Sequence, residues 1–203
     1  MTAKYDTDYF VNAKFSPYVT YPKSNMKGVD VIATLEARAE VIANSFPQGT
    51  TVIDWGCATG ILVNKLNEIG IAAIGYDFAD WAIANRVSSK VHQVNALEVY
   101  EDDIHEVELM HSCDFLEHIG EEDIYLLLLK MSRRCKKAMW HYVPFYPSLD
   151  KPVIGGGEIH LIQVNSAWWK NLFESIPGFK IVEFPLATHG GYIKLERIDK
   201  LEE

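Results

Sequence analysis

One stretch constrains the fold more than any other: residues 51–60, which read TVIDWGCATG. Its first three residues are β-branched or apolar, which is typical of a buried parallel strand, and Asp54 follows them. A turn of small residues then runs from Gly56 to Gly60. Small residues let the backbone approach a ligand closely and adopt unusual φ and ψ angles.

A helix is predicted directly after this turn, in the sequence ILVNKLNEIG. Leu62, Leu66 and Ile69 recur at i, i+4 and i+7, which predicts one apolar face, and Gly70 is a helix stop. Strand, glycine turn and helix together form the first unit of a nucleotide-binding α/β sheet.

The next residues repeat the same order of elements. Residues 72–76 predict a second strand with Asp77 at its carboxyl end, and Asp80 is a candidate cap for a helix that contains Trp81. Asp77 follows Asp54 by 23 positions. An acid at about this distance is where a ribose diol is bound in nucleotide-binding sheets. The simpler alternative is that Asp77 only caps the helix.

Three more strands, and a closing hairpin, are expected further along. Residues 91–95 form a short strand that ends at Asn95, and residues 107–112 form another that leads into Cys113 and Asp114. The helix after it has an apolar stripe that we assign to the core: Ile124, Leu127, Leu128 and Met131. A strand over residues 136–143, a glycine-rich loop around Gly155–Gly157, a helix capped by Asn165 or Ser166 and an antiparallel hairpin complete the chain.

The first 28 residues differ from this pattern, because aromatic residues are mixed there with polar ones and Pro17 and Pro22 interrupt any long helix. This segment is either an arm packed on the surface or a lid that closes over a ligand. We therefore predict a single domain over residues 1–203, with an arm or lid at 1–28 and a Rossmann-like core at 29–203.

The composition limits the kinds of partner that this chain is expected to bind. The 203 residues carry a net charge of −9, which disfavours binding to a nucleic-acid backbone or an anionic membrane. No apolar run approaches the roughly 18 residues of a membrane span, and no signal peptide is recognisable, so a cytoplasmic location is expected. The three cysteines are widely spaced, which fits neither a disulfide framework nor a C-x-x-C metal site.

The motif D-x-G-C-x-T-G, the acid at Asp77 and the run L-E-H-I after the fourth strand together resemble class I S-adenosylmethionine (SAM) methyltransferases. The resemblance covers residues 5–198 and implies a Rossmann-like α/β fold. Its sheet has seven strands, mostly parallel with an antiparallel last strand, and helices on both faces. Ala58 stands where the family usually has a second glycine.

The resemblance also assigns roles to residues, with SAM as cofactor and S-adenosyl-L-homocysteine as product. It implies that the methionine part is held by Asp54, Gly56, Cys57 and Gly60, and Ala58 is also counted among the cofactor-binding residues. By the same resemblance, Asp77 and Phe78 bind the ribose and one face of the adenine. The edge of the adenine is lined by Asn95, Ala96 and Leu97. Cys113 and Asp114 lie beside the reacting methyl group. Leu97 is equally suited to the core.

We expect methyl transfer to a hydroxyl, and less readily to an amine, of a small-molecule or glycan-like acceptor. The candidate general bases are His160, after the glycine-rich loop, and then His118, while His141 is as well explained as a core residue with satisfied hydrogen bonds. The identity of the acceptor and the oligomeric state have no sequence signature here. A nucleic-acid methyltransferase is disfavoured because the N/D-P-P-Y-type motif and a basic stripe are missing.

Two alternatives remain open. Asp114, Glu117 and His118 have the i, i+3, i+4 spacing of one helical face, and with His160 they offer the mixed ligands that a divalent ion accepts, although the principal interpretation needs no metal. This set resembles the E-x-x-E-H…H site of metal-using 2′-O-methyltransferases of small RNAs. The other alternative is a SAM-binding module without catalytic activity.

Overall fold

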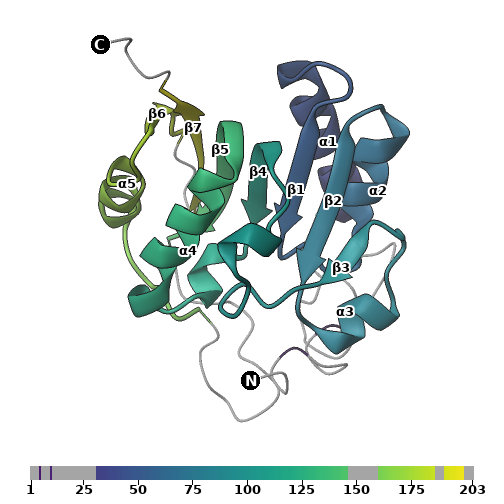
Figure 1. Ribbon diagram of the computed structural model, residues 1–203, viewed down its shortest axis with the longest axis horizontal. Coiled ribbons are helices and arrows are strands. Elements are labelled where there is room, and N and C mark those ends of the chain that lie inside the picture. The colour runs from purple at the N-terminus through teal and green to yellow at the C-terminus, as the bar shows by residue number, and fades with distance from the viewer. Residues whose placement is uncertain (1–4, 6–9, 11–30, 146–159, 186–189, 199–203) are drawn as a thin grey trace. The chain divides into compact units, whose positions relative to one another are not determined.

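A computed structural model describes Tyr5, Phe10 and residues 31–145, 160–185 and 190–198 of the chain, with no side-chain description at 31–33 (Figure 1). The predicted Gly155–Gly157 loop and most of the predicted arm at 1–28 lie outside these residues. No helix within the described ranges is both long enough and apolar enough to cross a membrane.

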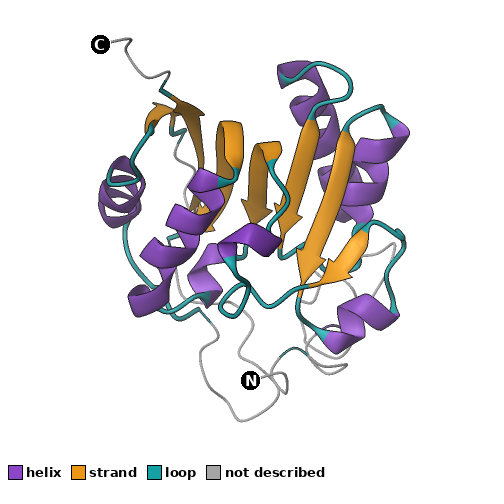
Figure 2. Cartoon of the chain, viewed as in Figure 1, coloured by secondary structure: helices purple, strands orange, loops and turns teal. Residues whose placement is uncertain are grey.

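Helices and strands alternate along most of the described chain, as Figure 2 shows by colour. The α-helices are α1 (Val31–Ser45), α2 (Ile61–Glu68), α3 (Asp80–Ala84), α4 (Glu121–Arg133) and α5 (Ser166–Glu174). Two short 3₁₀ helices are η3 (Glu101–Asp103) and η4 (Leu116–His118). The strands are β1 (Thr51–Trp55), β2 (Ala72–Asp77), β3 (Val91–Gln93), β4 (Val107–Cys113), β5 (Cys135–Pro144), β6 (Phe179–Glu183) and β7 (Gly190–Arg197).

The strands form one seven-stranded sheet in the order β3-β2-β1-β4-β5-β7-β6. β4 pairs in parallel with both β1 and β5, and β2 pairs in parallel with β3. β7 runs antiparallel to β5 and β6, which makes it the one reversed strand of the described sheet. The predicted sheet, mostly parallel with an antiparallel last strand, is confirmed.

Contacts divide the chain into two compact units. The first unit contains α1, α2, β2, α3 and β3, together with the turn from Cys57 to Gly60. The second unit contains β1, β4, η4, α4 and β5, followed by α5, β6 and β7. The prediction of one domain over residues 1–203 stays a prediction.

The core of the second unit follows the sequence pattern closely. All four residues of the predicted apolar stripe on α4 are at most 2% exposed, as assigned to the core: Ile124, Leu127, Leu128 and Met131. On α5, Trp169 and Phe173 are fully buried, and the Phe173 ring stacks on that of His141 in β5 with 5.5 Å between centroids. Burial of these side chains removes apolar surface from water and thereby holds both helices on the unit.

Two details of the first unit differ from the sequence prediction. Leu62 and Leu66 are buried as expected, but Ile69 is 39% exposed. Helix α2 ends at Glu68, and Gly70 then has a φ of +86°, so Ile69 leaves the apolar face. Asp80 is not the cap of α3, because the helix begins at Asp80 itself and the capping position is occupied by Ala79.

One aromatic residue of the N-terminal segment, Phe10, is buried. Phe10 is 4% exposed, and it packs in a core cluster with Ala58, Ala79 and Ala82. Its ring stacks on that of Trp81 with 4.7 Å between centroids and 12° between planes. Phe10 therefore belongs to the core of the first unit, and the prediction of an arm or lid over residues 1–28 stays a prediction.

The cap of α5 gives a test of this local structure. The Asn165 side chain accepts a hydrogen bond from the backbone N–H of Trp168 at 3.1 Å, as predicted for one of the two candidate caps. Asn165→Ala is expected to lower the free energy of unfolding by about 1 kcal/mol, because an N–H of the first turn loses its partner. Urea denaturation measures this change. Asn165→Asp keeps the acceptor and serves as the control, so an equal loss in both variants would contradict the capping role.

Candidate functional site

The turn after β1 is joined to the end of β2 by hydrogen bonds within the first unit. The Asp77 carboxylate accepts from two backbone N–H groups, that of Ala58 at 2.8 Å and that of Ala79 at 2.9 Å. The N–H of Cys57 donates to the carbonyl of Tyr76 at 3.2 Å. Asp77 therefore fixes the turn at Ala58, which has a φ of +49° that residues other than glycine seldom adopt.

Helix α2 begins directly after this turn and has no side-chain cap. Gly60 is its capping residue, with a φ of +79°, and this position makes no side-chain capping hydrogen bond. The first three residues of the helix, Ile61–Val63, are nevertheless buried. Free N–H groups at a helix start normally need partners, and a ligand with a negative group satisfies that need.

The residues predicted to contact adenine differ from one another in their neighbours and in their exposure. The Phe78 ring meets that of Tyr5 edge-on, with 5.2 Å between centroids. Strand β3 ends at Gln93, two residues before the predicted end at Asn95, which is half-buried. Leu97 is 36% exposed, so the alternative that it is a core residue is wrong.

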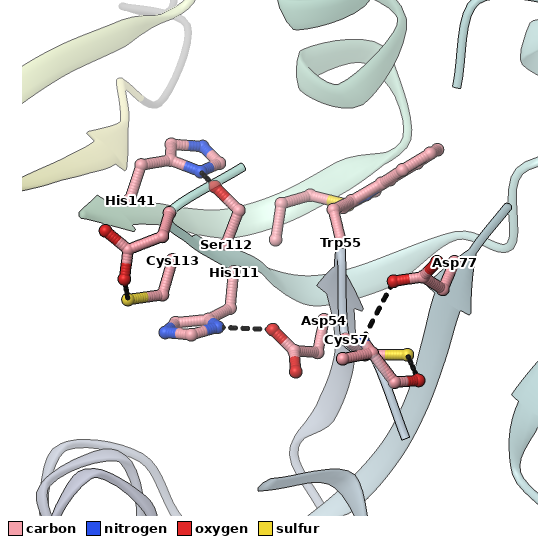
Figure 3. A network of polar contacts seen from close by, with 11 residues as sticks. Asp54, Trp55, Cys57, Asp77, His111, Ser112, Cys113 and His141 are labelled. Carbon is pink, nitrogen blue, oxygen red and sulfur yellow. Dashed lines mark hydrogen bonds and ion pairs between the residues drawn. The ribbon is translucent and has the colours of Figure 1, made fainter. Parts of the chain in front are cut away.

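Asp54 and His111 form a buried polar pair in the second unit. The parallel pairing of β1 and β4 sets these two residues opposite each other. His111 Nδ1 lies 2.7 Å from Asp54 Oδ1, and the two residues are 2% and 5% exposed (Figure 3). A carboxylate can only accept, so His111 donates through Nδ1.

The turn residue Gly56 is constrained by packing in this unit. Its φ is +68°, and a Cβ atom at this position would lie 2.6 Å from Cδ2 of Phe115. A larger residue would therefore both strain the backbone and push the Phe115 ring away. The predicted glycine at the start of the turn thus has a structural reason.

The residues after β4 do not continue as the α-helix that the sequence spacing suggested. Asp114 has a φ of +49°, and only a single 3₁₀ turn, η4, follows it. Asp114 is exposed and accepts a hydrogen bond from the thiol of Cys113 at 3.2 Å. The prediction that Asp114, Glu117 and His118 share one helical face is therefore wrong, because the left-handed residue breaks the helical repeat.

Three of the four predicted metal ligands nevertheless come together. The ligand atoms of Glu117, His118 and His160 all lie within 4.8 Å of one another, and Asp114 is not part of this group. Each histidine Nε2 lies 3.8 Å from Glu117 Oε1. His160 is held close because the two residues after it, Leu161 and Ile162, donate their N–H groups to the Glu117 carbonyl at 2.8 and 3.1 Å.

Glu117 is the unusual member of this group. Its side chain is 0% exposed, and within the described residues neither carboxylate oxygen has a hydrogen-bond partner. Burial, and secondarily the charge of Asp114, raise the pKa of Glu117 well above its ordinary value. Buried carboxylates are usually paired or bound to a cation, so this geometry favours a positively charged ligand.

His141 is a core residue, which is one of the two roles that the sequence allowed for it, the other being a general base. It is fully buried in β5, and its Nδ1 lies 2.8 Å from the hydroxyl oxygen of Ser112 (Figure 3). Its Nε2 has no partner among the described residues, so its hydrogen bonds are only half satisfied. Burial, and secondarily His111, lower the pKa of His141 to about 3.

The fold and the glycine turn together define the class of this protein, that of the class I SAM-dependent methyltransferases. Residues 29–143 match a protein family described as "Methyltransferase domain", which is just over half of the chain. The chain belongs to this family, and the predicted methyltransferase is thereby confirmed. No curated protein sequence matches the chain.

Solved structures agree on the fold. Magnesium protoporphyrin IX methyltransferase (ChlM) from Synechocystis PCC 6803 with bound SAM has a TM-score of 0.66 and 14% identity, covering 94% of both chains. A SAM-dependent methyltransferase from Archaeoglobus fulgidus has a TM-score of 0.62 and 16% identity, covering 83% of this chain and 95% of its own. The small RNA methyltransferase HEN1 has a TM-score of 0.63 and 14% identity, covering 83% of this chain and 25% of its own.

Sequence reasoning missed His111, for which it found no positional argument. The signal lies in the strand pairing, because β1 and β4 are neighbours in the sheet. Aligning the two buried strands in parallel places Val52 beside Leu109 and Asp54 beside His111. A polar residue at the same position of two adjacent strands indicates a pair.

The low pKa of His141 leads to a prediction about stability. Between its ordinary value of 6.5 and the folded value of about 3, the unfolded chain binds a proton that the folded chain excludes. The free energy of unfolding therefore falls as the pH is lowered through this window. His141→Leu should flatten this dependence, measured by urea denaturation from pH 7 to pH 4.

The control for this experiment is His92→Gln, which replaces an exposed histidine of β3. This variant should keep the slope of the unmodified chain. An unchanged slope in His141→Leu would show that His141 is not the group that takes up the proton on unfolding.

Proposed function

We propose that this chain transfers the methyl group of SAM to a hydroxyl of a small-molecule or glycan-like acceptor. The methyltransferase family supports the reaction type. The observation that carries the choice of a hydroxyl is the group of Glu117, His118 and His160, since two imidazoles and a carboxylate are suited to removing a hydroxyl proton or to holding a cation that does so.

The residues of each unit fit the chemistry of the cofactor. In the first unit, the uncapped and buried start of α2 suits the carboxylate of the methionine part. The Asp77 carboxylate, at the end of β2, accepts hydrogen bonds from backbone N–H groups, and the same acceptor chemistry suits the hydroxyls of a ribose. In the second unit, the buried carboxylate of Asp54 suits the ammonium of the methionine part.

The remaining assignments are also proposals. Gly56, Cys57 and Gly60 shape the turn around the methionine part, Phe78 contacts one face of adenine, and Asn95, Ala96 and Leu97 line its edge. Cys113 and Asp114 lie near the reacting methyl group in this proposal. SAM supplies an activated methyl group bound to a sulfonium.

The reaction needs alignment more than chemical assistance. The acceptor oxygen attacks the methyl carbon in line, the carbon–sulfur bond breaks with its electrons going to sulfur, and the acceptor proton passes to a base. Alignment of two reactants in a dry site contributes on the order of 7–11 kcal/mol. The base adds roughly 10²–10⁴-fold. His160 is the first candidate for this base and His118 is the second. Their side chains are 11% and 13% exposed, respectively.

Titration calorimetry with SAM tests the cofactor assignment. Asp77→Ala is expected to weaken SAM binding at least tenfold, because ribose hydroxyls lose a charged acceptor and the turn loses its anchor at Ala58. Asp80→Ala is the matched control. Asp80 is an exposed aspartate three residues away that accepts from Gln93, and its loss should leave the affinity unchanged. Equal affinities of all three proteins would refute the assignment of Asp77.

Catalysis is separated from mere binding by product formation. A SAM-binding module without activity would bind SAM and release no S-adenosylhomocysteine in the presence of candidate acceptors. Screening hydroxylated metabolites and glycans for this product therefore tests turnover. Structures of similar fold include enzymes named for a porphyrin and for small RNA, so both classes of acceptor belong in the screen.

A second candidate function, metal-assisted O-methylation, is favoured by one specific observation. Glu117 is fully buried without a hydrogen bond to a described residue, and two histidine nitrogens lie 3.8 Å from one of its oxygens. One carboxylate and two imidazoles suit a divalent transition metal or zinc. In this case Glu117, His118 and His160 would hold the ion, which would act as a Lewis acid on the acceptor oxygen, and neither histidine would serve as the base.

Metal removal distinguishes the two mechanisms. If a divalent ion takes part, chelation should abolish methyl transfer, and adding back Mn²⁺ or Zn²⁺ should restore it. Glu117→Gln should lower Mn²⁺ affinity by at least tenfold in calorimetry, whereas the exposed Glu121→Gln should not. Equal activity before and after chelation would exclude a metal-dependent mechanism.

A further inference from the structure

The buried pair of Asp54 and His111 is not explained by the fold alone. Parallel register sets the two residues opposite each other on β1 and β4, and 2.7 Å separates His111 Nδ1 from Asp54 Oδ1. Figure 3 shows the His111 ring directed at one oxygen of the Asp54 carboxylate. The second oxygen, Oδ2, makes no hydrogen bond to a described residue.

A carboxylate in this position needs fixed donors. Asp54 is 5% exposed, so it has lost most of the water that hydrates a free carboxylate. An ionised carboxylate has only acceptor sites, and buried polar groups normally use them. Here His111 uses one oxygen, and the other has no hydrogen-bond partner among the described residues.

From this arrangement we infer that His111 is a positioning residue that aims Asp54 at the ammonium group of the methionine part of SAM. The inference rests on the proposed function, since it requires SAM to bind at Asp54. His111 holds Oδ1 and thereby fixes the rotation of the carboxylate, which directs Oδ2 to the ligand. His111 itself makes no contact with the cofactor in this proposal.

The ammonium is the part of SAM that matches this acceptor. It carries a full positive charge and three N–H donors, and a hydrogen bond between charged groups is shorter and stronger than a neutral one. The burial of the His111 ring, at 2% exposure, limits its own freedom to turn. A preset carboxylate loses little orientational freedom when the ligand binds, so the affinity for an ammonium ligand rises.

The test compares two ligands that differ in the methionine part. S-adenosylhomocysteine contains the α-ammonium and carboxylate, whereas 5′-methylthioadenosine lacks both and keeps adenosine and sulfur. His111→Leu should weaken S-adenosylhomocysteine binding by roughly tenfold to a hundredfold, which is the size expected for one charged hydrogen bond. The affinity for 5′-methylthioadenosine should stay within about twofold. Titration calorimetry measures both constants.

A matched pair of amide variants tests the same contact if His111→Leu does not fold. The Asn side-chain nitrogen stands as many bonds from Cα as histidine Nδ1, while the Gln nitrogen stands one bond further out. His111→Asn should therefore retain S-adenosylhomocysteine affinity to within a few fold, and His111→Gln should lose it as leucine does. Thermal unfolding curves establish that each variant is folded before titration.

The outcomes separate this inference from the proposed function. If the unmodified chain binds neither ligand, the proposed cofactor is wrong. If it binds both and His111→Leu weakens them equally, His111 has only a structural role and the inference is overturned. Equal S-adenosylhomocysteine affinity in the Asn and Gln variants would overturn it too. A selective loss for S-adenosylhomocysteine, rescued by asparagine, supports it.

Discussion

The parallel pairing of β1 with β4 is the constraint on which the second unit depends. It sets Val52 beside Leu109 in the core and Asp54 beside His111 at the ends of the two strands. A shift of one residue would exchange the two faces of a strand, so the apolar residues also fix where the polar residues lie. The same register therefore builds the core and places a carboxylate and an imidazole within hydrogen-bonding distance.

Strong local patterns in the sequence were sufficient to predict most of the fold. The apolar stripe of α4 follows a helical period, and residues 51–60 combine a short apolar run with a turn of small residues. Both lie where predicted, as does the closing pair of strands. The errors fell where a single backbone angle decides the outcome. Asp114 has a positive φ, which no spacing rule predicts. The α-helix that was expected to start at this residue therefore does not form there.

The candidate site was predictable in its residue types but not in its partners. The grouping of Glu117 and His118 with His160 depends on backbone hydrogen bonds between segments more than 40 positions apart, which periodicity cannot indicate. His111 was missed because its role comes from a neighbouring strand and not from its own segment. The burial of Phe10 has no signal in its own segment, because its partners Ala58, Ala79 and Ala82 lie far along the chain.

The attachment of His160 has a consequence for how such a protein can diversify. The N–H groups of Leu161 and Ile162 fasten this part of the chain to the carbonyl of Glu117, so the imidazole is held from its C-terminal side. Because this attachment uses backbone N–H groups, it does not depend on which side chain stands at position 160. Evolution, or a protein engineer, can therefore exchange the imidazole for another functional group while the anchoring hydrogen bonds are kept.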